Sequence, residues 1–147
     1  MCFQPLTPAQ NSLLPIDKHD SSSAILHLAI LSPPELEPLI PDLITWLQDE
    51  NWPIFSSVRD LLLRYPEIVV EPVRTVLRGD DEQWLKNCLE HLVMGMPKEC
   101  QLRLKAETER VATNPTDDER DWEAEKIASE ILKVLDNGTE SNAGPSA

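Results

Sequence analysis

Prolines constrain the fold of this chain more than any other residue type. The 147 residues include 13 prolines and only 4 glycines, and the prolines stand between segments whose apolar residues recur at helical spacing. Because a proline lacks the backbone N–H and clashes with the carbonyl four residues earlier, it starts or ends helices and is kept out of central strands. No sustained alternation of apolar and polar residues, which is typical of strands, is present. The sequence therefore predicts an all-α fold.

The apolar periodicity predicts seven short helices. Their approximate ranges are 21–31, 35–48, 52–65, 67–78, 81–94, 98–112 and 117–135. Pro38 and Pro41 are expected to break the second of them, so that its regular part begins at Pro41. Since short connections favour antiparallel neighbours, we expect about three helix pairs and an extra N-terminal helix.

Two segments resemble each other at a shift of about thirty residues, a period shorter than that of the usual HEAT repeat. PDLITWLQDENW, from Pro41, and PVRTVLRGDDEQW, from Pro72, each run from a proline through an apolar helix to an acidic turn and a tryptophan. Such repetition indicates an array of stacked helix pairs. We expect a short right-handed HEAT-like α-solenoid over residues 15–136, with a poorly ordered extension (1–14) and a disordered tail (137–147).

The charge of the chain narrows its partners. It carries 26 acidic and 13 basic residues, a net charge of −13. The electrostatic field of this negative charge repels phosphate backbones, which excludes nucleic acid as a partner and favours a basic protein or peptide, although solubility alone also accounts for the charge.

Three cysteines without CxxC spacing indicate a reducing compartment. With no signal peptide and no apolar run long enough for a bilayer, we expect a soluble cytoplasmic protein without membrane partners.

An acidic stretch that ends in a tryptophan recurs at three expected helix junctions. We call each such stretch an acidic corner. The three are DENW (49–52), DDEQW (80–84) and DDERDW (117–122). Acidic side chains accept from the unpaired N–H groups of a helix start and complement its positive dipole end. Thr116 with Glu119 predicts a capping box, and a tryptophan in the first turn is expected to close the apolar stripe.

Stacked pairs would place these turns along one edge of the molecule. DKHD (17–20), before the first helix, would lie on the same edge. We therefore predict an acidic-aromatic ridge that binds a basic partner. Its members are Asp17, His19, Asp20, Asp49, Glu50, Asn51, Trp52, Asp80, Asp81, Trp84, Asp117 and Asp118. The alternative is a set of well-capped helices with no further role, because caps alone explain the acidic residues.

A metal site is a second alternative. Asp17, His19 and Asp20 lie within four residues, and with Asp49 or Glu50 they offer ligands for a divalent cation or groups for a hydrolase. Local spacing does not show that such ligands converge, and a turn with Asp20 as helix cap explains the same residues. Nucleotide-binding, zinc-protease and triad patterns are absent. We therefore expect a non-enzymatic interaction module without cofactor, metal or catalytic residues.

Three stretches together resemble a known family. They are LPIDKHD (14–20), LIPDLITWLQDENWPIFSSVRDLLLRY (39–65) and NPTDDERDWEAEKIASEIL (114–132). They resemble the domain of unknown function 5071, a family of small bacterial and fungal proteins, over roughly Leu14 to Leu135. The most specific pieces are Asp17-Lys18-His19-Asp20 and Asn51-Trp52-Pro53. The resemblance implies a HEAT-like helical fold and, since the family has no established activity, supplies no catalytic residues.

Overall fold

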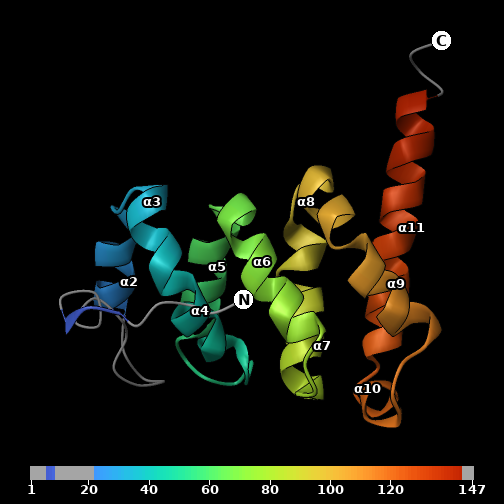
Figure 1. The fold of residues 1–147 in the computed structure, drawn as a ribbon, viewed down its shortest axis with the longest axis horizontal. Helices are drawn as coiled ribbons and strands as arrows, with labels where there is room; N and C mark the ends of the chain where they lie inside the picture. Colours follow the sequence, from blue (N-terminus) through green and yellow to red (C-terminus); the bar gives the residue numbers. More distant parts are fainter. Residues whose placement is uncertain (1–5, 9–21, 144–147) are drawn as a thin grey trace. The chain divides into compact units, whose positions relative to one another are not determined.

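The structure is a computed structural model that describes the backbone of residues 6–8 and 22–143, and the side chains of 6–8 and 25–136. All regular elements in these ranges are helices, and no strand occurs among them (Figure 1). This confirms the all-α prediction. By its internal contacts the chain divides into two compact units, Met1–Val73 and Arg74–Ala147.

The first unit consists of short helices around an apolar core. Its elements are α2 (Ser22–Ala29), α3 (Pro33–Leu36), the 3₁₀ helix η1 (Glu37–Leu39), α4 (Ile40–Leu43), the 3₁₀ helix η2 (Ile44–Leu47), α5 (Phe55–Leu63) and most of α6 (Pro66–Leu77). α5 packs against α2 and against η2. Fully buried leucines and isoleucines, among them Leu28, Leu43 and Leu62, form its core.

Prolines break the helical stretch that follows Ser32 into four pieces. Pro38 lies in η1 and Pro41 near the start of α4. Because each removes one hydrogen bond of the helical ladder, the chain tightens locally into 3₁₀ turns. The Thr45 hydroxyl also donates to the Asp42 carbonyl, a local bond that competes with helix. The prediction of a regular helix from Pro41 is therefore wrong, since only Ile40–Leu43 is α-helical there.

The second unit begins with the last turn of α6 and contains the longer helices. Its elements are α7 (Glu82–His91), η3 (Val93–Gly95), α8 (Lys98–Arg103), α9 (Lys105–Thr113), α10 (Asp117–Asp121) and α11 (Ala124–Ala143). α11 packs against α7 and against α9, to which it runs antiparallel (Figure 1). Buried residues such as Leu85, Leu89 and Ile131 fill its core.

The predicted helix boundaries differ from the observed ones in this unit. The helix expected over 98–112 ends at Arg103 and begins again at Lys105. A turn interrupts the helix expected over 117–135, and within it Glu123 has φ 59°, in the left-handed region that non-glycine residues rarely adopt. Residues 137–143, which the sequence assigns to a disordered tail, continue α11 as helix. Nowhere in the described residues is a helix long and apolar enough to cross a membrane.

Candidate functional site

The first acidic corner, DENW, closes a turn and does not cap a helix. Asn51 N donates to Asp49 Oδ1 at 2.9 Å, and Trp52 N donates to the Asp49 carbonyl at 3.1 Å. α5 begins only at Phe55, and no side chain caps it. The expectation that the acidic side chains of DENW cap the start of this helix is therefore wrong. Trp52 instead packs edge-to-face on Trp46, with ring centroids 5.9 Å apart.

The second corner caps α7 as the sequence predicts. Asp81 has an extended backbone, and its Oδ1 accepts from Trp84 N at 3.0 Å. Trp84 is half-buried and lies in the first turn of the helix. Asp80, one residue before the cap, is exposed. The corner therefore uses one carboxylate for structure and leaves its neighbour at the surface.

The third corner contains the predicted capping box of α10. Glu119 N donates to Thr116 Oγ1 at 3.1 Å, and Thr116 N donates to Glu119 Oε1 at 2.8 Å. Asp117 forms an ion pair with Arg120 at 3.1 Å. Trp122 follows the last residue of α10 and is 44% exposed, so the expected tryptophan in the first turn is wrong at this corner.

A buried ion pair links α9 to this third corner. Glu119 is only 3% exposed, and each of its carboxylate oxygens accepts from Arg110 at 2.8 Å. Arg110 Nη2 also donates to the Leu77 carbonyl, at the end of α6, at 3.2 Å. Burial raises the pKa of the Glu119 carboxyl, but the bonds from Arg110 and from Thr116 N outweigh it and hold the pKa below its usual value. The hydrogen bonds that Arg110 donates to Glu119 in turn raise the pKa of Arg110.

A second buried carboxylate, that of Glu107 on α9, faces the end of α6. Arg78 Nη2 lies 2.8 Å from Glu107 Oε2, and Arg74 Nε lies 3.5 Å from Oε1. Burial raises the pKa of the Glu107 carboxyl, but the hydrogen bonds from Arg78 and the charges of both arginines lower it further than burial raises it. Glu107 and Arg110 together connect α9 to the α6–α7 turn and to α10.

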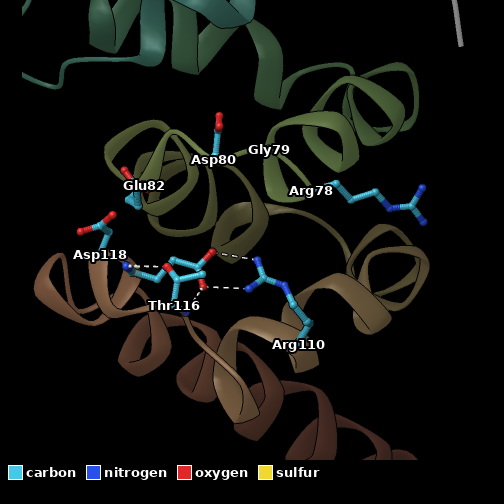
Figure 2. A pocket seen from close by; sticks show the side chains of 8 residues that line it. Arg78, Gly79, Asp80, Glu82, Arg110, Thr116 and Asp118 are labelled. Carbon is cyan, nitrogen blue, oxygen red and sulfur yellow. Dashed lines mark hydrogen bonds and ion pairs between the residues drawn. The ribbon is translucent and has the colours of Figure 1, made fainter.

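A pocket of about 310 Å³ opens beside this ion pair (Figure 2). Its lining residues are Arg78, Gly79, Asp80, Glu82, Arg110, Thr116, Asp118 and Glu119. They come from the α6–α7 turn and the first turn of α7, from α9, and from the start of α10. In Figure 2 the side chains of Glu82 and Asp118 point to one side, while Arg78 extends the opposite way.

The charged side chains of this pocket that have no ion pair among the described residues are all negative. Arg110 and Glu119 neutralise each other, and Arg78 is bound to Glu107. Asp80, Glu82 and Asp118 have no ion pair with any side chain that the structure describes. We call this pocket, with the eight residues that line it, the acidic pocket. Three unpaired carboxylates around one concavity favour a cationic side chain over an anionic one.

The predicted ridge residues divide into three groups. Asp80 and Asp118 lie together in the acidic pocket, whereas the side chain of Asp81 caps α7 and that of Asp117 is paired with Arg120. Asp49, Glu50, Asn51 and Trp52 belong to the first unit, so the ridge as one continuous surface stays a prediction. Asp17, His19 and Asp20 lie outside the described residues, and so does the metal site predicted from them.

Sequence reasoning missed Glu82 and both buried ion pairs. The sequence contains a signal for the ion pair of Glu107. Glu107 lies between Leu104 and Val111 at helical spacing, so a helix that buries this apolar stripe also buries the Glu107 side chain. A buried carboxylate requires a cationic partner, and arginine is the usual one. The identity of the partner carries no such signal, because Arg74 and Arg78 are about thirty residues away in the sequence.

Comparison with known families identifies a family that covers most of the chain. A family model described as Domain of unknown function (DUF5071) matches residues 13–132, which is most of the chain. No curated protein matches the chain. The matched range includes every residue of the acidic pocket.

Proposed function

Since this chain belongs to the family described as a domain of unknown function (DUF5071), which names no activity, we propose a function from its surface chemistry. We propose that it is a non-catalytic interaction module that binds a basic protein or peptide through the acidic pocket. One observation carries the proposal. Asp80 and Glu82, from the α6–α7 turn and the start of α7, and Asp118, from α10, line one pocket and have no cationic partner among the described residues.

The chemistry of the pocket supports a lysine or arginine side chain as the group that is bound. Its carboxylates lie at the surface or close to it, so they lose little hydration when a cation approaches. Exposed ion pairs stabilise weakly, so affinity depends on several acting together. The net charge of −13 adds long-range attraction, which raises the association rate with a basic partner.

We propose that the wider architecture is a short HEAT-like α-solenoid, a class that presents helix-pair surfaces to protein partners. The antiparallel packing of α9 on α11, and the packing of α5 on η2, support helix pairs as its units. In such an array the first-unit acids of the predicted ridge would extend the binding surface. Cys88 and Cys100 are buried thiols, which supports a reducing, cytoplasmic setting.

The test is the binding of a labelled hexaarginine peptide, followed by fluorescence anisotropy at low ionic strength. The variant Asp80→Asn, Glu82→Gln, Asp118→Asn removes the three charges and keeps the side-chain shapes. Three exposed ion pairs at about 0.5 kcal/mol each amount to about 1.5 kcal/mol, so we expect a loss of about tenfold in affinity.

A matched control separates the pocket from net charge. Glu99→Gln, Asp121→Asn, Asp136→Asn removes the same number of charges from exposed positions of the same unit outside the pocket. Long-range attraction alone would weaken binding equally in both variants, and that result would refute the proposal. A loss specific to the pocket variant, and smaller at high salt, supports it.

A further inference from the structure

We infer that Arg110 and Glu119 are positioning residues of the acidic pocket, which hold Asp118 beside Asp80 and Glu82 so that the three carboxylates act on one cation. This inference rests on the proposed function and adds the residues that set the geometry of its site. Neither Arg110 nor Glu119 is proposed to contact the partner, since their charges neutralise each other.

The position of Asp118 depends on its neighbour Glu119. α10 has only five residues, too few for a helix to be stable by itself. Glu119 anchors it, because its carboxylate is 3% exposed and accepts two bonds from Arg110 and one from Thr116 N. Asp118 is the residue immediately before this anchor, so its carboxylate is placed wherever Glu119 is held.

Arg110 connects that anchor to the opposite wall of the pocket. Its Nη2 donates to Glu119 and also, at 3.2 Å, to the carbonyl of Leu77. Leu77 ends α6, and the turn that follows leads directly to Asp80 and to Glu82. One guanidinium therefore bonds to both chain segments that supply the free carboxylates. A lysine cannot replace it, because a single ammonium lacks the planar fork that makes these bonds at once.

The pairing also decides which carboxylates are available to a partner. With Glu119 saturated by Arg110, an incoming cation meets only Asp80, Glu82 and Asp118. If Arg110 loses its fork, α10 moves away from the α6–α7 turn and Asp118 no longer acts with the other two. The expected sign of the defect is weaker binding at unchanged net charge.

The test is a double-mutant cycle with the same hexaarginine peptide. Arg110→Lys keeps the charge but not the fork, and we expect it to weaken binding about threefold. If Arg110 acts by positioning Asp118, Arg110→Lys has no further effect once Asp118→Asn is present, because interacting residues are not additive. A merely structural role of Arg110 would give the same loss in both backgrounds, and that additivity would overturn the inference.

Two further variants complete the design. Arg59→Lys, in a surface pair with Asp60 in the first unit, is the matched control and should leave binding unchanged. Should Arg110→Lys not fold, Glu119→Gln replaces it in the cycle, since it keeps an oxygen for Thr116 N. If the triple pocket variant binds normally, the proposed function fails; if that variant loses binding while Arg110→Lys behaves like Arg59→Lys, only the positioning inference fails.

Discussion

The two units are stabilised by different means. In the first, the buried side chains that the structure describes are apolar, and prolines fix the backbone of its helices. The second contains every buried polar or charged side chain of the described residues. These are Asn87, Gln101, Glu107, Thr108 and Glu119.

This difference shows two ways of specifying an irregular helical structure. A proline restricts the chain by itself and needs no partner. A buried polar side chain specifies the structure only when its partners are in place, as when Gln101 donates to the carbonyl of Val93 at 2.8 Å. The second unit should therefore respond to pH and to the loss of single partners, whereas the first should respond mainly to changes in packing.

The largest effects are expected where the two units are alike. Leu62 in the first unit and Leu89 in the second are both fully buried. Truncation to alanine should lower the free energy of unfolding by about 2–5 kcal/mol at either position, through lost burial and the cavity that remains. Urea unfolding followed by tryptophan fluorescence measures both. A cost at Leu89 far below that at Leu62 would show that ion pairs, and not an apolar core, hold the second unit.

Acidic pH should destabilise the second unit more than the first. The folded structure lowers the pKa of Glu107 and Glu119 through their arginine partners. Their contribution to stability is therefore complete above the pKa of an unfolded glutamate, about 4.3, and is lost as the pH falls through the lower folded value. The free energy of unfolding of the second unit should therefore fall more than that of the first between neutral and acidic pH. In the variant Trp46→Phe, Trp52→Phe, the remaining tryptophans Trp84 and Trp122 report on the second unit alone.

The control for acid sensitivity is Glu107→Gln, Glu119→Gln. This variant should be less stable at neutral pH, and its stability should change less on acidification, because neither side chain titrates. In the first unit the pKa of Glu35 is also lowered, by the backbone N–H and hydroxyl of Ser32, but that carboxyl lies at the surface. Parallel pH curves for the variant and the original chain would mean that the buried pairs do not cause the acid sensitivity.

The sequence predicts the helices better than their interruptions. Periodic apolar residues identify α5, α6 and α7 to within a few residues, because each buries one continuous stripe. The two segments that look like repeats differ in structure, since Pro41 lies near the start of α4 whereas Pro72 lies inside α6. An isolated proline pattern does not distinguish these cases, because packing decides whether a helix continues past a missing hydrogen bond.

The candidate site was predictable only where its causes are local. The capping box of Thr116 and Glu119 and the cap at Asp81 follow from residues three apart, and both are confirmed. The pairing of Arg110 with Leu77 joins residues 33 apart, and no local pattern specifies it. The convergence of Glu82 with Asp118 depends on that same pairing, which is why Glu82 was not expected in the site.

The corners of the two units offer a smaller test of the comparison. Asp81 caps α7, so Asp81→Ala should cost about 1 kcal/mol, the usual value for a lost N-cap. The Asp49 carboxylate accepts only from Asn51 N within a turn, so Asp49→Ala should cost about half as much. Thermal unfolding of both variants measures the difference. Replacement by asparagine, which still accepts a hydrogen bond, should restore most of the loss at Asp81; equal costs at the two corners would contradict the assignment of a cap to one alone.

The smallest effect is expected at Glu123. Prolines interrupt the helices of the first unit, whereas in the second unit a residue with an unfavourable backbone conformation lies at the interruption between α10 and α11. Its φ of 59° disfavours any side chain with a Cβ, by about 1 kcal/mol. Glu123→Gly relieves that cost but loses the ion pair with Lys126 and gives the unfolded chain more freedom, so the net change should lie within about 0.5 kcal/mol. Glu123→Ala loses the same ion pair without the relief, and should be about 0.5 kcal/mol less stable than the glycine variant by urea unfolding, because the freedom that glycine adds to the unfolded chain offsets part of the relief. Equal stability of the two variants would show that the turn between α10 and α11 adapts to its residue, and that the second unit, unlike the first, does not depend on a fixed backbone at this junction.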